Sequence, residues 1–226
     1  MSDRRILIAY MIVGAANVLG NAAELPTLAN LTKPLLVPVL LAWLLVSRRG
    51  ALTSALRWLA VGLVFAWFGD LLLMVDGDLA FMAGIGAFLV MQVCYIVAFT
   101  RIPGPGFVRA WKITLVPYVG IWVVVNVLVS AGVGSLRIPV LIYSAVLVTM
   151  AVSALDLVLR VPRSPGWRVA WGALFFLVSD GFIALTEFGP LSATPTLSAL
   201  IMATYISAQL MIVTGLTECE NTPLSR

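Results

Sequence analysis

The stretch "ALRWLAVGLVFAWFGDLLLMV", Ala55 to Val75, decides the class of fold. A helix needs about 17 to 25 mostly apolar residues to cross the hydrocarbon core of a bilayer, and this run has that length. Its only charged side chains are Arg57 near the start and Asp70 near the end. The stretch therefore predicts a transmembrane helix that carries a carboxyl group inside the membrane.

The rest of the chain repeats this pattern. Its 226 residues are 62% hydrophobic and 11% charged, and the mean hydropathy is +1.07. Apolar runs bounded by charges, Pro or Gly predict an all-α polytopic membrane protein with eight transmembrane helices. These spans are Ile6 to Ala22, Pro34 to Val46, Ala55 to Val75, Leu79 to Thr100, Ile113 to Ser130, Ile138 to Leu159, Val169 to Phe188 and Pro195 to Leu216. The second span is the shortest, and Pro38 predicts a kink in it because proline lacks a backbone N–H.

The loops between the spans are short, so we expect one integral membrane domain over residues 1–226. The first span follows Arg4 and Arg5 as the core of a secretory signal would, and we expect it to be retained. A cytoplasmic N-terminus places every one of the 14 basic residues except Lys33 and Arg137 on the inner side, including Arg109 and Arg226. This asymmetry predicts that both termini are cytoplasmic in a cell-membrane protein. It also accounts for the net charge of +4 without a nucleic-acid partner.

The chain contains no histidine. This excludes a Ser-His-Asp triad and a His-ligated zinc site, two common solutions in hydrolases. Cys94 and Cys219 lie in or beside different spans and indicate no disulfide framework. We expect no metal ion and no cofactor.

Two aspartates are predicted at the same depth in the membrane. Asp70 follows Arg57, and Asp180 follows Arg168, by a rise of roughly 18 to 20 Å in parallel helices. A charged group at a helix centre costs at least about 2.5 to 3.5 kcal/mol and therefore suggests a functional site. The alternative is that each is protonated and bonded to a neighbouring helix as a packing device. Gly62 and Ala66 on the same face as Asp70 indicate that it points into the bundle.

Other polar groups have simpler interpretations. Asp156 precedes Arg160 by one helical turn, which predicts a local ion pair. Asp76 and Asp78 fall in a short outer turn, where solvated charges are expected. Each of the remaining intramembrane polar residues, taken alone, predicts a hydrogen bond between helices. Taken together, they predict a polar chamber that opens outward. These residues are Asn17, Asn21, Gln92, Tyr95, Tyr118, Trp122, Asn126, Tyr205 and Gln209.

Five segments in order and register resemble the YhhN family of lysoplasmalogenase-like membrane proteins. They are "TKPLLVP" (Thr32 to Pro38), "FGDLLLM" (Phe68 to Met74), "GAFLVMQVCYIVAF" (Gly86 to Phe99), "GALFFLVSDGFIAL" (Gly172 to Leu185) and "YISAQLMIVTG" (Tyr205 to Gly215). The resemblance implies an eight-helix enzyme that cleaves the vinyl ether bond of a lysophospholipid, releasing a fatty aldehyde and a glycerophospho-base. The residues that match the family's polar pattern are Lys33, Asp70, Asp78, Asp180, Tyr205 and Gln209. Gln92 stands where many relatives have histidine, which puts a proton shuttle at that position in doubt.

Vinyl ether hydrolysis needs an acid, a base and negative charge near an oxocarbenium ion, and two carboxyl groups in a poorly solvated site can divide these roles. We therefore predict Asp70 and Asp180 as the catalytic pair. The predicted substrate-binding residues are Lys33, Asp78, Gln92, Tyr95, Tyr205 and Gln209; Lys33 is placed to meet the lipid phosphate, although a snorkelling interfacial lysine is the alternative.

Two other classes of protein remain open. A proton-coupled transporter or lipid-binding protein also keeps carboxyl groups in the membrane. An intramembrane aspartyl protease uses two aspartates as well, but Trp67, Phe68 and Gly69 precede Asp70 in place of a G-x-G-D signature.

Overall fold

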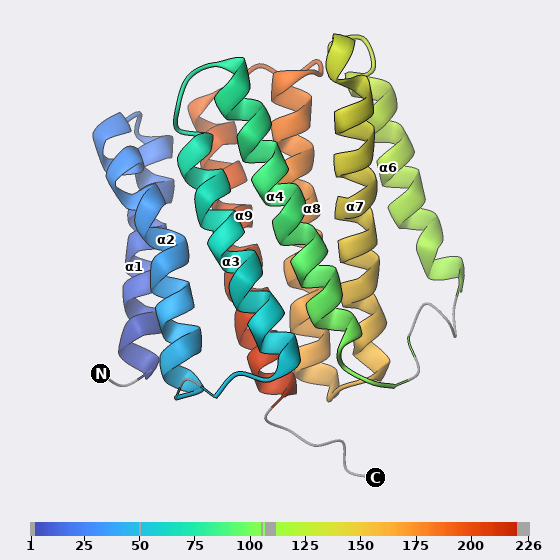
Figure 1. The fold of residues 1–226 in the computed structure, drawn as a ribbon. Helices are drawn as coiled ribbons and strands as arrows, with labels where there is room; N and C mark the ends of the chain where they lie inside the picture. The colour runs from blue at the N-terminus through green and yellow to red at the C-terminus, as the bar shows by residue number, and fades with distance from the viewer. Residues whose placement is uncertain (1–2, 50, 105, 107–111, 221–226) are drawn as a thin grey trace.

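The computed structural model describes residues 3–49, 51–104, 106 and 112–220. Within them, eight helices are long and apolar enough to cross a membrane, and they stand side by side in one bundle (Figure 1). They are α1 (Asp3–Ala22), α2 (Pro26–Ser47), α3 (Ser54–Leu72), α4 (Asp78–Thr100), α6 (Leu115–Val129), α7 (Arg137–Asp156), α8 (Arg163–Glu187) and α9 (Pro195–Cys219). Short 3-10 turns, Lys112–Thr114, Gly134–Leu136 and Leu157–Leu159, extend α6 and α7. The chain is a multi-pass membrane protein, as predicted.

The described basic residues gather at one end of the bundle, except for Lys33 and Arg137. Helix α1 begins and α9 ends at this same end (Figure 1). Arg109 and Arg226 lie outside the described residues. Which side of the membrane this end faces, and the single domain over the whole chain, stay predictions. The predicted local ion pair between Arg160 and Asp156 is confirmed.

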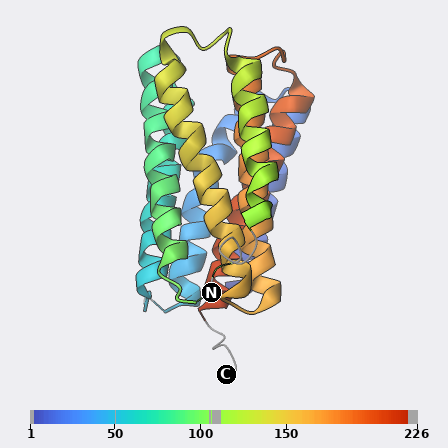
Figure 2. The same cartoon turned by 90° about the vertical axis from the view of Figure 1, so that its right-hand side faces the viewer.

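The bundle has a tight centre and a loose edge. Helix α9 packs against α8 and also touches α1, α2 and α3. A Cβ atom on Gly172 would lie 2.9 Å from Ile212, and one on Gly215 would lie 2.8 Å from Val169, so these two glycines allow α8 and α9 to approach closely. In contrast, α6 lies at the edge of the bundle in Figure 1, is turned toward the viewer in Figure 2, and buries only Val129.

The predicted boundaries of α2 and α8 are wrong. Helix α2 begins at Pro26, eight residues before the expected start, and continues through Pro34 and Pro38. Pro38 leaves the carbonyl oxygen of Pro34 without its helical partner, and Trp67 of α3 donates its indole N–H to that oxygen at 2.9 Å. Helix α8 begins at Arg163 rather than Val169, because Pro165 is tolerated in the first turn, where N–H groups have no helical partner.

Candidate active site

Asp70 lies in α3 on the side that faces the interior of the bundle, as predicted, and is only 3% exposed. Gly62 and Ala66 share this side and are also buried. A Cβ atom on Gly62 would lie 2.6 Å from the ring of Tyr95. The missing side chain therefore lets α4 pack closely against α3 just below Asp70.

A chain of buried hydrogen bonds positions the Asp70 carboxyl group. Tyr205 of α9 donates to Oδ2 of Asp70 at 2.7 Å. Gln209, one turn further along α9, donates from Nε2 to the Tyr205 hydroxyl oxygen at 3.5 Å and accepts from the Tyr95 hydroxyl at 2.6 Å. These contacts link α3, α9 and α4 and restrict the rotation of the carboxyl group.

Asp180 of α8 has a tyrosine partner of its own. Tyr143 of α7 donates to Oδ2 of Asp180 at 2.5 Å. The preceding residue, Ser179, is buried and donates to the carbonyl oxygen of Ile201 at 3.0 Å, which holds α8 against α9 at this level. Each carboxyl group is thus fixed through one oxygen, and in the described part of the chain the two groups do not hydrogen-bond to each other.

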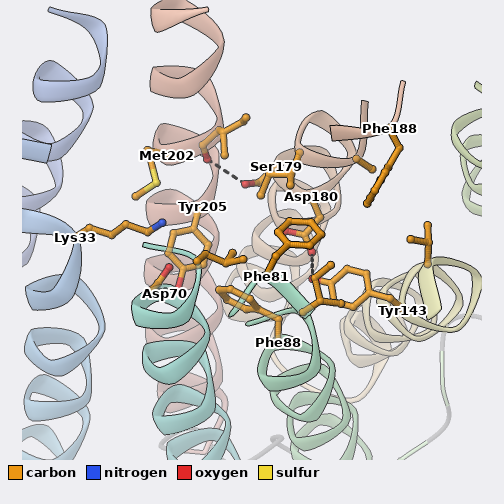
Figure 3. A pocket seen from close by; sticks show the side chains of 16 residues that line it. Lys33, Asp70, Phe81, Phe88, Tyr143, Ser179, Asp180, Phe188, Met202 and Tyr205 are labelled. Atoms are coloured by element: carbon orange, nitrogen blue, oxygen red, sulfur yellow. Dashed lines mark hydrogen bonds between the residues drawn. The ribbon is translucent and has the colours of Figure 1, made fainter. Parts of the chain in front are cut away.

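Both aspartates border one cavity of about 110 Å³. Figure 3 shows Lys33 on one side of it and Tyr143 on the other, with Asp70, Tyr205 and Asp180 between them. The rest of the wall is apolar apart from Ser179: Leu73, Phe81, Ile85, Phe88, Val140, Ile183, Ala184, Phe188, Ile201 and Met202. A mostly apolar cavity with a few convergent polar groups is the usual form of a small-molecule site.

Lys33 is half-buried in the second turn of α2. Its side chain extends toward Tyr205 and Asp70 (Figure 3), and its positive charge attracts the Asp70 carboxylate. No carboxylate of the described residues lies within 4.0 Å of the Lys33 ammonium group. This group therefore borders the cavity without forming a salt bridge.

Of the predicted substrate-binding residues, Lys33 and Tyr205 border this cavity, whereas the other four do not. Asp78 is exposed in the first turn of α4. Tyr95 and Gln209 are buried behind Tyr205. Gln92 is fully buried beside Tyr143 and close to its hydroxyl group, but no hydrogen bond of ordinary geometry joins its amide to the described residues. Contact of these four side chains with a substrate stays a prediction.

The predicted polar chamber is wrong as a single space. Asn17 donates to Thr32 at 3.0 Å and joins α1 to α2, whereas Trp122 donates to Ser144 at 3.0 Å and joins α6 to α7. None of these four side chains borders the cavity between Asp70 and Asp180, although Trp122 and Ser144 line a second cavity beside it. Similar depth predicts one chamber, but Asn17 and Trp122 each bond to a neighbouring helix on a different part of the bundle.

Sequence reasoning missed Tyr143. A lone tyrosine near a predicted membrane boundary is typical of an interfacial anchor, and nothing in its spacing indicates a partner on another helix. Its position six residues after Arg137, close in depth to Asp180, is the one signal that the sequence offered. Within the described ranges, no three Cys, Asp or Glu side chains group so as to hold a metal ion.

Comparisons with known proteins point to one family. The model of the YhhN family matches residues 28–216. A protein named lysoplasmalogenase from Mycobacterium bovis (strain ATCC BAA-935 / AF2122/97) is 31% identical over 165 residues, which are 70% of this chain and 60% of that relative. The lysoplasmalogenase of Mycobacterium tuberculosis (strain CDC 1551 / Oshkosh) matches with the same identity and the same shares.

The match thus spans 60% of the length of these curated relatives. The comparison with solved structures found no match. The family match covers most of the chain and includes the helices that carry Lys33, Asp70, Asp180 and Tyr205. This chain belongs to the YhhN family.

Proposed function

We propose that the chain is a hydrolase of the cell membrane that cleaves the vinyl ether bond of a lysoplasmalogen or a related lysolipid. The products are a fatty aldehyde and a glycerophospho-base. The observation that carries the proposal is the cavity between Asp70 and Asp180, two tyrosine-bound carboxyl groups in a mostly apolar wall. Relatives named lysoplasmalogenase support the choice of substrate class.

In the proposed reaction, one aspartate donates a proton to the second carbon of the vinyl ether. The C=C electrons form the new C–H bond, and the ether oxygen shares the positive charge of the resulting oxocarbenium ion. The other aspartate, as a carboxylate, stabilises this cation and takes a proton from the water that attacks the first carbon. In the hemiacetal, the first aspartate takes back a proton from the new hydroxyl group as the C=O bond forms, the C–O bond to glycerol breaks, and the second aspartate gives its proton to the glycerol oxygen, which leaves as an alcohol. The aldehyde is released and both aspartates return to their starting states.

The two tyrosines position the carboxyl groups for this division of roles. Each donates to Oδ2, and the Oδ1 atoms make no hydrogen bond to the described residues. The Oδ1 atoms are therefore free to meet a reacting group in the cavity. Lys33, at the Asp70 side, is placed to attract the lipid phosphate.

The test is aldehyde release by the purified full-length protein in nanodiscs. A 1-alkenyl lysophospholipid is the substrate, and the matched 1-O-alkyl lipid, which lacks the double bond, is the negative control. Asp70→Asn and Asp180→Asn should each lower the turnover number by about 100-fold or more, the usual contribution of acid–base groups. Asp76→Asn, the same substitution in an exposed turn, should retain wild-type turnover. No aldehyde from any vinyl ether lysolipid, together with aspartate-dependent proton-coupled uptake, would establish the transporter class instead.

A further inference from the structure

A second cavity of about 70 Å³ lies between α6, α7 and α8. It shares part of its wall with the first cavity, namely Val140, Tyr143, Asp180 and Ala184. The Asp180–Tyr143 pair therefore stands at the junction of the two spaces. A ligand that occupies both has to pass this pair.

The second cavity is suited to an apolar ligand or ligand segment. Its polar side chains already satisfy one another, since Trp122 donates to Ser144 at 3.0 Å and Asn126 donates to the Trp122 carbonyl oxygen at 2.8 Å. The remaining wall is aliphatic, including Val125, Leu147 and Leu177. Beyond Asp180, at the junction with the first cavity, a polar ligand would find no unpaired partner and would lose its hydration.

From this arrangement, and on the basis of the proposed function, we infer that the cavity between α6, α7 and α8 binds the hydrocarbon chain of the lysolipid. The order of groups across the site favours one direction of the ligand. Lys33 lies at one side, the two aspartates lie in the middle, and Tyr143 leads to the second cavity (Figure 3). An amphiphile with its phosphate at Lys33 then places its vinyl ether between the aspartates and its chain beyond Asp180.

The loose packing of α6 leaves space for the hydrocarbon chain of the lipid. Of its residues only Val129 is buried, so few contacts oppose a small outward shift of this helix. A groove of about 300 Å³ between α6 and α7 adjoins the second cavity and shares Trp122, Asn126 and Val129 with it. The hydrocarbon chain of the ligand can thus continue past the closed part of the second cavity toward the surrounding bilayer.

The groove also contains Arg137, which offers a reverse orientation with the phosphate at the rim and the chain in the first cavity. Arg137 is exposed, whereas Lys33 is half-buried and extends into the cavity. The structure therefore favours the phosphate at Lys33, and the two orientations predict different neighbours for the end of the chain.

Gly181 allows the second cavity to be filled selectively. It lies in the wall, and a Cβ atom there would have nothing within 4 Å. Leucine has a higher helix propensity than glycine, so Gly181→Leu should fold. Gly120→Leu is the matched control, because Gly120 is an exposed residue of α6 with equally open space that does not border this cavity.

The experiment uses the full chain in nanodiscs and a saturated 1-O-alkyl lysophospholipid with a diazirine near the end of its chain. After illumination, peptide mass spectrometry should find the label on Val125, Leu147 or Leu177. Gly181→Leu should reduce this labelling by about tenfold or more, because the excluded methylene groups lose their apolar contacts. Gly120→Leu should leave it unchanged. Label confined to Ile85 and Met202, or undiminished label in folded Gly181→Leu, would overturn the inference.

Since this lipid is not hydrolysed, the result does not depend on catalysis. Labelling at α6, α7 and α8 without aldehyde release from alkenyl lipids would leave the chain site standing and remove the proposed hydrolase activity. Aldehyde release with the label confined to the first cavity would support the hydrolase activity and overturn the hydrocarbon site between α6, α7 and α8.

Discussion

The indole N–H of Trp67 lies 2.9 Å from the carbonyl oxygen of Pro34 and donates a hydrogen bond to it. The oxygen is available because Pro38 cannot donate to it. Within a membrane an unpaired carbonyl group is costly, so this contact compensates for the proline in α2. It also ties α3, which carries Asp70, to the turn of α2 that carries Lys33.

Trp67→Phe should therefore lower the free energy of unfolding by about 0.5 to 2 kcal/mol, the range found for hydrogen bonds between membrane helices. Reversible denaturation in mixed micelles measures this change. Trp58→Phe in the same helix is the control, since Trp58 is 37% exposed and should change stability far less. Equal stability of the two variants would show that the indole contact contributes nothing.

Gly62→Ala should destabilise the bundle by about 1 to 3 kcal/mol through overpacking. The new methyl group would lie 2.6 Å from the ring of Tyr95, which is buried and held by Gln209. Gly86→Ala adds the same group in open space and should be neutral or slightly stabilising. Thermal unfolding of both variants in the same detergent measures the difference in stability. An unchanged stability of Gly62→Ala would contradict the close packing of α3 and α4.

Tyr143→Phe and Tyr205→Phe should each reduce the turnover number for aldehyde release by about 10- to 100-fold. Each change removes the hydroxyl group that orients a carboxyl group, so the loss should be smaller than for the aspartate variants. Tyr118→Phe, which removes a hydroxyl group outside the cavity, should keep wild-type turnover. Wild-type rates for both cavity variants would show that the tyrosines do not position the aspartates.

Lys33→Gln should raise KM for a phosphate-bearing lysolipid by about tenfold, the equivalent of one charge-assisted hydrogen bond. The turnover number should change less, because a contact with the phosphate is made equally in the bound substrate and in the transition state. Lys33→Arg should restore most of the affinity, and Lys112→Gln, at the other end of the bundle, should have no effect. An unchanged KM for Lys33→Gln would favour the snorkelling alternative.

Hydrolysis in D₂O should place one deuterium on the second carbon of the aldehyde, because the proposed acid protonates that carbon. Rapid reduction of the aldehyde to the alcohol preserves the label for mass spectrometry. Product without deuterium would contradict protonation at carbon and hence the assigned roles of the aspartates.

Much of this fold follows from the sequence because the bilayer restricts the choice. Eight apolar runs predict eight helices, since only internally bonded segments can cross the membrane. The early start of α2 was missed because Pro34 and Pro38 are typical of a helix beginning. Their tolerance inside α2 depends on Trp67, a residue of another helix, and spacing within one segment cannot reveal such a partner.

The candidate site also has features that the sequence predicts and features that only the packing of helices decides. The depth of Asp70 and Asp180 is set by their position along their helices and was predicted, and both border one cavity. Their catalytic roles stay a proposal. Tyr143 escaped prediction because its contact with Asp180 depends on which face α7 presents to α8, and this is decided by packing rather than by sequence spacing.

The four groups that define the site come from helices far apart along the chain: Asp70 from α3, Tyr143 from α7, Asp180 from α8 and Tyr205 from α9. During synthesis, the first seven spans enter the membrane before Tyr205 does. A chain still emerging from the ribosome thus carries Asp70 without its partner. The contacts that hold Asp70 are therefore complete only when α9, the last of the described helices, has joined the bundle.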